Sequence, residues 1–313
     1  LMLAVSLMAC GLAHAAWPEK PIHIVVAFPP GSTTDIIARA ITAPLGEALG
    51  QPIIIENKPG AGGNIATVGV ARGPADGHTF LMHSVAYSVN PSLYARLPYD
   101  PLKDFAPVTN LVNFPLLLVT HPSVPAKNTR ELVALAKSKP GQLTYASPGS
   151  GNSGHLAGEL FEESNHVHLL HVPYRGGALA LNDLLGGQID LLFETAQFMA
   201  PHIKAGKVVP FGVAGSKRYP GLPDVPTLIE SGMKDFDVTS WQAVAAPKGT
   251  PPEILRKLHA DIAKGFHAPD MVQRFNGLGF EVVVNPPAEA QAFFKSEIER
   301  WSAVVKASGA TVD

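Results

Sequence analysis

The sequence predicts an α/β fold of two lobes with a ligand cleft between them, and three observations support it. Short apolar runs alternate with segments whose apolar residues recur at helical spacing, which is typical of β-α-β units and a mostly parallel sheet. This alternation starts again in the middle of the chain. A chain of 313 residues is also too long for one compact α/β core and suits two lobes.

The first series of elements begins with an apolar run over residues 22–28, which suits a buried parallel strand. Apolar residues at helical spacing predict a helix over 33–49, and Gly50 is placed to end it. The other elements expected here are strands over 52–55 and 79–82 and a helix over 63–71.

Proline-rich segments at 97–107 and 219–226 flank the second series and predict linkers. Between them we expect strands over 116–120, 143–146, 167–172, 189–193 and 208–213, and helices over 129–138, 152–163 and 178–185. The last part predicts a strand over 238–245 and helices over 252–266 and 286–306, which we expect to pack on the first lobe. Residues 17–115 and 227–313 would form lobe 1, residues 116–226 would form lobe 2, and the chain would cross between them twice.

Residues 1–16 predict a secretory signal peptide that directs the protein to the periplasm. The segment is mostly apolar, has no Lys, Arg, Asp or Glu, and ends in the small-x-small pattern Ala13-His14-Ala15. It is too short to span a membrane. The only cysteine, Cys10, allows an alternative, in which a lipoprotein signal leaves a lipid anchor at Cys10.

The composition argues against two classes of protein. A formal charge of −2 does not fit a nucleic-acid binder, which would show a basic patch or a high pI. With 46% hydrophobic and 16% charged residues, the chain is not expected to be disordered.

Two loops that join a strand to a helix are candidate binding elements. In the first, residues 27–35, Ser32 and Asp35 fit a capping box. Amides at a helix start attract anions, although a well-capped helix with no ligand explains the pattern equally well. The second loop spans residues 147–155 and belongs to the other lobe. Ligands of α/β sheets lie at the carboxyl ends of strands, so both loops can face one cleft.

The second loop also allows an enzyme hypothesis. Gly149, Gly151 and Gly154 match G-x-G-x-x-G, as in a dinucleotide-dependent enzyme. That hypothesis expects an acidic residue after the next strand; the chain has none there, although Arg175 would suit a 2′-phosphate. A nucleophilic serine is disfavoured because His155 replaces the last glycine of G-x-S-x-G.

Three neighbouring histidines, His166, His168 and His171, are a candidate metal site. On a strand, His166 and His168 would share one face and His171 would point to the other, so a polar strand edge is the better interpretation. We expect no metal and no cofactor.

Many stretches of the chain resemble the substrate-binding receptors of tripartite tricarboxylate transporters, the Bug or TctC family. The resemblance covers nearly all of the chain after Trp17. It is carried by AFPPGSTTD (27–35), ENKPGAGGN (56–64), LPYDPLKDFAPV (97–108), YASPGSGNSGHLAGELF (145–161), HVPYRGG (171–177), DLLGGQIDLLF (183–193), LPDVPTLIESG (222–232) and TSW (239–241).

The resemblance implies an α/β protein with the type II periplasmic-binding-protein fold, in which two lobes enclose a ligand cleft. It also implies a receptor, not an enzyme, that captures a small organic acid for the membrane subunits of such a transporter. Dicarboxylates, tricarboxylates, amino acids and aromatic acids are the ligands it implies. We expect a monomer that binds no nucleic acid. On matching positions, the ligand-binding residues implied are Phe28, Gly31, Ser32, Thr33, Thr34, Asp35, Ser84, Val85, Ala86, Ser147, Ser150, Asn152, Ser153, His155, Glu194 and Thr195.

The sequence departs from the family pattern at two places. Ser32 follows Gly31 where the family often has further glycines, which leaves less room and adds a hydroxyl. Glu194-Thr195 stands where the family often has Asp-Asn. The longer acid would accept a hydrogen bond from a ligand amine or hydroxyl, or would be structural.

Overall fold

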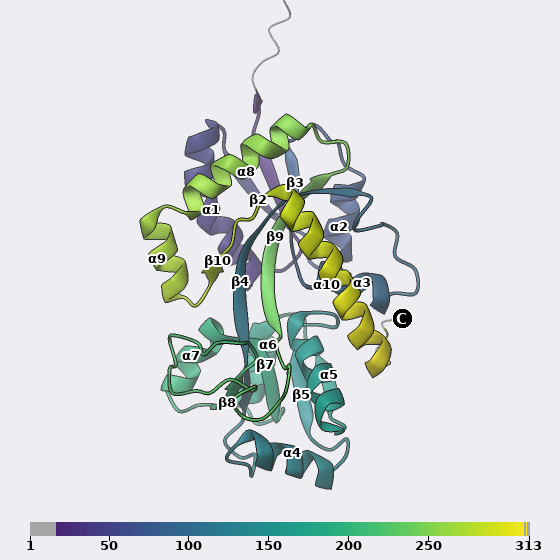
Figure 1. The fold of residues 1–313 in the computed structure, drawn as a ribbon, viewed down its shortest axis with the longest axis vertical. Helices are drawn as coiled ribbons and strands as arrows, with labels where there is room; N and C mark the ends of the chain where they lie inside the picture. Colours follow the sequence, from purple (N-terminus) through teal and green to yellow (C-terminus); the bar gives the residue numbers. More distant parts are fainter. Residues whose placement is uncertain (1–16, 310, 312–313) are drawn as a thin grey trace, which may run out of the picture.

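The computed structural model describes residues 17–309 and Thr311, and Figure 1 shows two lobes that follow one another along the long axis. The predicted signal peptide and Cys10 lie outside the described residues. The strands are β1 Ile22–Val26, β2 Ile53–Asn57, β3 Thr79–Ser84, β4 Phe105–Thr120, β5 Thr144–Ser147, β6 Leu170–Pro173, β7 Leu191–Thr195, β8 Val209–Val213, β9 Thr239–Pro247 and β10 Glu281–Val282.

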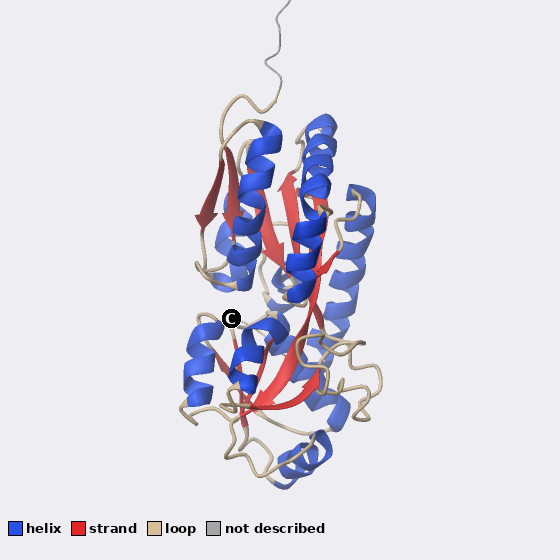
Figure 2. Cartoon of the chain, turned by 90° about the vertical axis from the view of Figure 1, so that its left-hand side faces the viewer, coloured by secondary structure: helices blue, strands red, loops and turns tan. Residues whose placement is uncertain are grey.

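Helices cover both sides of the sheet in the upper lobe, as Figure 2 shows. The helices are α1 Thr33–Leu49, α2 Asn64–Ala71, α3 Ala86–Leu93, α4 Thr129–Ser138, α5 Ser153–Asn165, α6 Gly177–Leu185, α7 Ala196–Lys204, α8 Pro252–Phe266, α9 Pro269–Gly277 and α10 Pro287–Ser308, with a short 3₁₀ turn at Ala61–Gly63. Most predicted elements are present with their ends within a few residues, and α1 has the predicted bounds. The elements α3, α7, α9 and β10 were not predicted from the sequence.

One sheet runs through both lobes, in the order β2-β1-β3-β9-β4-β7-β5-β6, with β8 and β10 also paired to β4. The pairs β1–β2 and β1–β3 are parallel in the first lobe, as are β5–β6 and β5–β7 in the second, which confirms the predicted β-α-β organisation. The strands β4 and β9 are antiparallel to their neighbours.

The two lobes are joined through β4. Its first part, up to Pro115, pairs with β9, and its last part, from Leu116, pairs with β7 and β8. The strand β9 starts at Thr239, opposite Pro115, where the chain returns to the first lobe. The predicted linker over 97–107 is therefore partly strand, because β4 already begins at Phe105.

The C-terminal helices confirm only part of the expectation that they pack on the first lobe. The helix α8 packs on α1, and its buried residues join those of α1 in one apolar core. The helix α10 packs on α3 in the first lobe and also on α5 in the second. It spans the boundary because Phe294, Trp301 and Val305 contribute to the core that contains Leu156 and Phe161 of α5.

Candidate functional site

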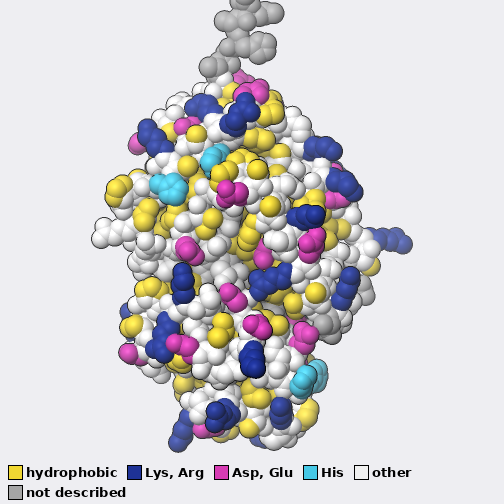
Figure 3. Space-filling view, viewed as in Figure 1, with side chains coloured by type: hydrophobic (Ala, Val, Ile, Leu, Met, Phe, Trp, Pro, Cys, Tyr) yellow, Lys and Arg dark blue, Asp and Glu magenta, His cyan; other side chains and the backbone are white. Residues whose placement is uncertain are grey.

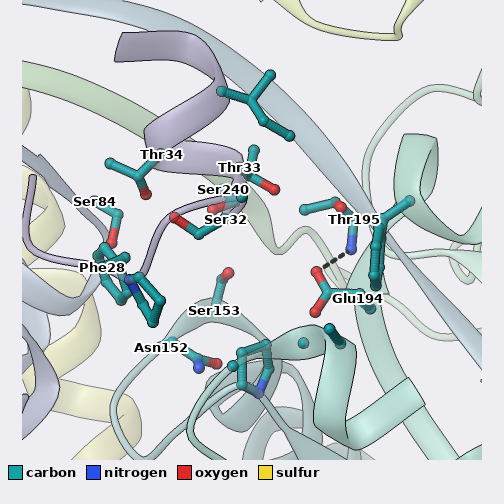
Figure 4. Close-up of a pocket in the computed structure, with 18 of the residues that line it drawn as sticks. Phe28, Ser32, Thr33, Thr34, Ser84, Asn152, Ser153, Glu194, Thr195 and Ser240 are labelled. Carbon is teal, nitrogen blue, oxygen red and sulfur yellow. Dashed lines mark hydrogen bonds between the residues drawn. The ribbon is translucent and has the colours of Figure 1, made fainter. Parts of the chain in front are cut away.

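A cavity of about 240 Å³ lies between the two lobes, and both predicted loops contribute to its wall. Figure 4 shows the polar side chains that face it: Ser32, Thr33 and Thr34 from one lobe and Asn152, Ser153 and Glu194 from the other. Each group lies at the carboxyl end of a strand, where ligands of α/β sheets bind. The two halves of the site therefore belong to different lobes.

The first loop is held in shape by Asp35. Its carboxylate accepts hydrogen bonds from the Gly31 N–H (2.9 Å), from Arg39 Nε (2.9 Å) and from Asn57 Nδ2 (2.9 Å). Burial by itself would raise the pKa of Asp35, but the hydrogen bonds from Arg39, Gly31 and Asn57 outweigh it and leave the pKa below its usual value. Asp35 is buried and does not line the cavity. Its part is to fix the loop.

The first turn of α1 presents its amides to the cavity. The Ser32 hydroxyl accepts the Asp35 N–H (3.3 Å) as the predicted N-cap, and Gly31 takes the positive φ of 79° that the turn requires. The first turn of a helix leaves its amides without intrahelical partners, so the N–H groups of Thr33 and Thr34 remain free to bind an anion. Both residues line the cavity.

The second loop is organised around Asn152, the N-cap of α5. Its Oδ1 accepts the Gly154 N–H (2.9 Å) and the His155 N–H (3.2 Å). Its Nδ2 group is buried and has no hydrogen-bond partner, although Asn152 lines the cavity. A buried donor without a partner is costly, so this amide group is ready for an acceptor on a ligand.

Two other polar residues of the second loop, Ser147 and His155, stabilise it without lining the cavity. The Gly151 N–H donates to His155 Nδ1 (3.1 Å), and the Ser147 hydroxyl lies 2.7 Å from His171 Nε2. The rings of His155 and His171 stack with centroids 4.2 Å apart. Burial, with a smaller contribution from His155, lowers the pKa of His171 to about 3, so this imidazole is neutral at pH 7.

The three histidines of the candidate metal site are separated. His166 and His168 precede β6, which starts at Leu170, so the expectation that they share a strand face is wrong. His168 pairs with Glu162 at the surface, whereas His171 packs under the second loop. In the described part of the chain, no three His, Cys, Asp or Glu side chains are grouped as metal ligands would be.

Glu194 ends β7 and contributes a buried carboxyl group to the cavity wall. One oxygen accepts the Thr195 N–H (2.7 Å), as drawn in Figure 4. Burial raises the pKa of Glu194 to about 7, and the hydrogen bond from the Thr195 N–H offsets this only in part. A Cβ atom on Gly177 would overlap Glu194 Oε2, so the glycine at the start of α6 leaves room for the carboxyl group.

Ten of the sixteen residues implied by the resemblance line the cavity: Phe28, Gly31, Ser32, Thr33, Thr34, Ser84, Asn152, Ser153, Glu194 and Thr195. The other six lie outside its wall: Asp35, Val85, Ala86, Ser147, Ser150 and His155. Val85 and Ala86 are buried at the start of α3, and Val85 belongs to the apolar core that also contains Leu156 and Phe161 of α5.

Several residues of the wall were not identified from the sequence. The apolar ones include Ile36, Phe114, Leu179 and Phe198, and the polar ones are Arg175, Gln197, Ser240 and Gln242. Ile36 and Leu179 are 42% and 52% exposed, and they line the cavity from opposite lobes. Exposed apolar side chains in a concave site are typical of ligand contact.

This arrangement defines a class of protein, the two-lobed α/β binding proteins that hold a small ligand between their lobes. Arg175 and Glu194 are the only charged side chains among the residues that line the cavity. On the face drawn in Figure 3, basic and acidic side chains are interspersed. Within the described residues, no helix combines the length and the apolar character needed to cross a membrane.

Comparison with known proteins identifies the family. The family model of the tripartite tricarboxylate transporter family receptors matches residues 37–310, and the chain belongs to this family. Its members are binding receptors, so the protein is a receptor rather than an enzyme. The residues outside the match include the first loop.

Three solved structures are similar over nearly their full length. The Rhodopseudomonas palustris protein Rpa4515 with adipate is 36% identical, with a TM-score of 0.89 over 95% of this chain and 100% of that one. The periplasmic binding protein BugD is 37% identical, with a TM-score of 0.87 over 94% of this chain and 99% of that one. MatC from Rhodopseudomonas palustris, with bound malate, is 35% identical, with a TM-score of 0.86 over 92% of this chain and 100% of that one.

Proposed function

We propose that this receptor captures a small organic carboxylate in the cleft between its lobes and delivers it to the membrane subunits of a tripartite tricarboxylate-type transporter. The observation that carries the proposal is the pair of helix starts, α1 and α5, that face one cavity from opposite lobes. The related structures that hold adipate and malate support a carboxylate ligand.

The carboxylate would bind to neutral donors. The amides of Thr33 and Thr34 lie on one side of the cavity, and Asn152 Nδ2 and the Ser153 hydroxyl lie on the other. Hydrogen bonds to a charged group contribute roughly 1.5–3 kcal/mol each, and the helix start adds roughly 0.3–1 kcal/mol. A few such contacts are enough to hold a small anion without a lysine in the site.

The remaining expectations form part of the same proposal. Residues 17–115 and 227–313 would move as one lobe and residues 116–226 as the other, with residues 113–117 and 226–240 as hinges. Residues 1–16 would be removed as a signal peptide during export to the periplasm, and the mature protein would act as a monomer. The periplasmic location is supported by the similarity to BugD.

A thermal-shift screen with organic acids tests this function. A ligand at about 100 Kd should add roughly 2.7 kcal/mol to the free energy of unfolding. We expect at least one dicarboxylate, hydroxy acid, amino acid or aromatic acid to raise the melting temperature, and NADP to leave it unchanged. A shift with NADP and with none of the acids would support the dinucleotide hypothesis instead.

A further inference from the structure

One wall of the cavity presents two side-chain amide oxygens that have no hydrogen-bond partner among the described residues. Gln242 is only 3% exposed, and its Oε1 atom has no hydrogen-bond partner among the described residues. The Oε1 atom of Gln197 is also buried without a partner. Both side chains line the cavity, as does the Glu194 carboxyl group.

Glu194 is not part of an ion pair. It is 7% exposed, and in the described chain no Lys, Arg or His side chain lies within ion-pair distance of it. The one cation in the cavity wall, Arg175, is exposed and forms no ion pair with it. The Thr195 N–H donates a hydrogen bond to this carboxyl group, but no cation pairs with it. Because buried charges are normally paired, a donor group on a ligand could supply the missing partner.

Other parts of the cavity wall have the complementary chemistry. They offer donors: the Asn152 Nδ2 group and the Ser153 hydroxyl from one lobe and the amides that begin α1 from the other. In Figure 4, the side chain of Ser153 lies between Asn152 on one side and Glu194 on the other. A ligand that satisfies both sides needs a carboxylate at one end and a hydrogen-bond donor at the other.

We therefore propose that Glu194, with Gln197 and Gln242, forms an acceptor subsite that selects organic acids carrying a hydroxyl or an ammonium group beyond the carboxylate. This inference rests on the proposed function and specifies its ligand class. It predicts that plain dicarboxylates are poor ligands, because their second carboxylate would meet unpaired acceptors. A protein in which Arg175 bound that second carboxylate would show the opposite preference.

The test uses two series of acids in which only the terminal group changes. The four-carbon series is butanoate, 4-hydroxybutanoate, 4-aminobutanoate and succinate, and the six-carbon series is hexanoate, 6-hydroxyhexanoate, 6-aminohexanoate and adipate. Calorimetry on the full mature protein at pH 7 gives each affinity. In at least one series, the hydroxy or amino acid should bind at least tenfold more tightly than the dicarboxylate and the methyl-ended acid.

Two variants assign this preference to Glu194. In Glu194→Gln the amino acids should lose at least tenfold in affinity while the hydroxy acids lose less, because the amide still accepts a hydrogen bond. In Glu194→Leu both preferences should disappear. Glu289→Gln makes the same chemical change at an exposed site outside the cavity and should leave every affinity unchanged.

A proton count separates an acceptor subsite from a purely structural carboxyl group. An ammonium beside Glu194 favours the ionised form, so an amino acid should release a fraction of a proton when it binds at pH 7. Calorimetry in buffers of different ionisation enthalpy measures this release, which Glu194→Gln should abolish. Proton uptake, equal affinity for all terminal groups, or tightest binding of the dicarboxylates would overturn the subsite and leave the receptor function intact. If none of the eight acids binds and the thermal-shift screen finds no other acid, the proposed function fails as well.

Discussion

The Oδ1 atom of Asn152 accepts the Gly154 N–H at 2.9 Å while the Nδ2 group of the same side chain is buried without a partner. One side chain thus caps α5 and offers a donor to the cavity. These two tasks can be separated by substitution.

Asn152→Asp should keep the cap and remove the donor. Aspartate is an equally good N-cap, and its charge suits a helix start, so the free energy of unfolding of the empty protein should hardly change. The new carboxylate would repel the carboxylate of the ligand. We expect at least a hundredfold loss of affinity, about 2.7 kcal/mol, by calorimetry. Asn128→Asp is the control for affinity, because the Oδ1 atom of Asn128 also caps a helix, α4, and lies away from the cavity. Unchanged affinity in Asn152→Asp would show that the acid binds elsewhere.

Thr33→Pro removes one amide from the start of α1. Proline is tolerated at the first position of a helix, and the ψ of 159° at Ser32 is compatible with a following proline. The empty protein should keep its melting temperature, while affinity for the acid should fall tenfold or more, about 1.4 kcal/mol. Thr33→Ala keeps the amide and should cost less than about 1 kcal/mol. Full affinity in Thr33→Pro would mean that the capping box serves only the helix.

Glu194 should make the empty protein less stable as the pH rises. The pKa of about 7 in the folded state lies above the ordinary value of 4.5, so between these values the folded state binds more protons than the unfolded state. Stability should therefore fall from pH 4.5 to pH 7. At pH 8, Glu194→Gln should be more stable than the wild type by up to about 3 kcal/mol, and the difference should vanish below pH 4.5. Denaturant unfolding at both pH values measures it, and a variant that is less stable at pH 8 would refute the expectation.

Ligand binding should close the two lobes on each other. The strand β4 passes between them, and its register against β9 shifts between Asn110 and Val112, close to the proposed hinge at 113–117. Such irregularities bend a strand and are suited to absorb a change in backbone angles. Small-angle scattering should give a smaller radius of gyration with a saturating acid. An equal radius in both states would count against closure.

Local signals predicted much of the fold. The helix α1 begins and ends at the predicted residues because Ser32 and Gly50 mark its two ends. The helices α3 and α7 were missed because each contains a proline, Pro91 and Pro201, which predicts a break. Tertiary packing overrides that local preference.

The two loops of the site could be predicted from the sequence, but several other residues of the cavity wall could not. Its two loops carry capping residues and glycines, which are visible in a sequence. Gln197 lies on the missed helix α7, and Gln242 lies on β9, which is buried on both faces and shows no alternation to indicate which side chains face the cavity. The distinction between Asn152, which lines the cavity, and His155, which supports the loop from behind, also depends on the folded arrangement.

A crystal structure of the protein with the acid that binds most tightly tests the central claim most directly. The account predicts one carboxylate between the two helix starts, within hydrogen-bond distance of the Thr33 or Thr34 amide and of Asn152 Nδ2, directly or through one water. Density for the acid outside the cavity between the lobes, or a carboxylate that contacts neither helix start, would contradict it.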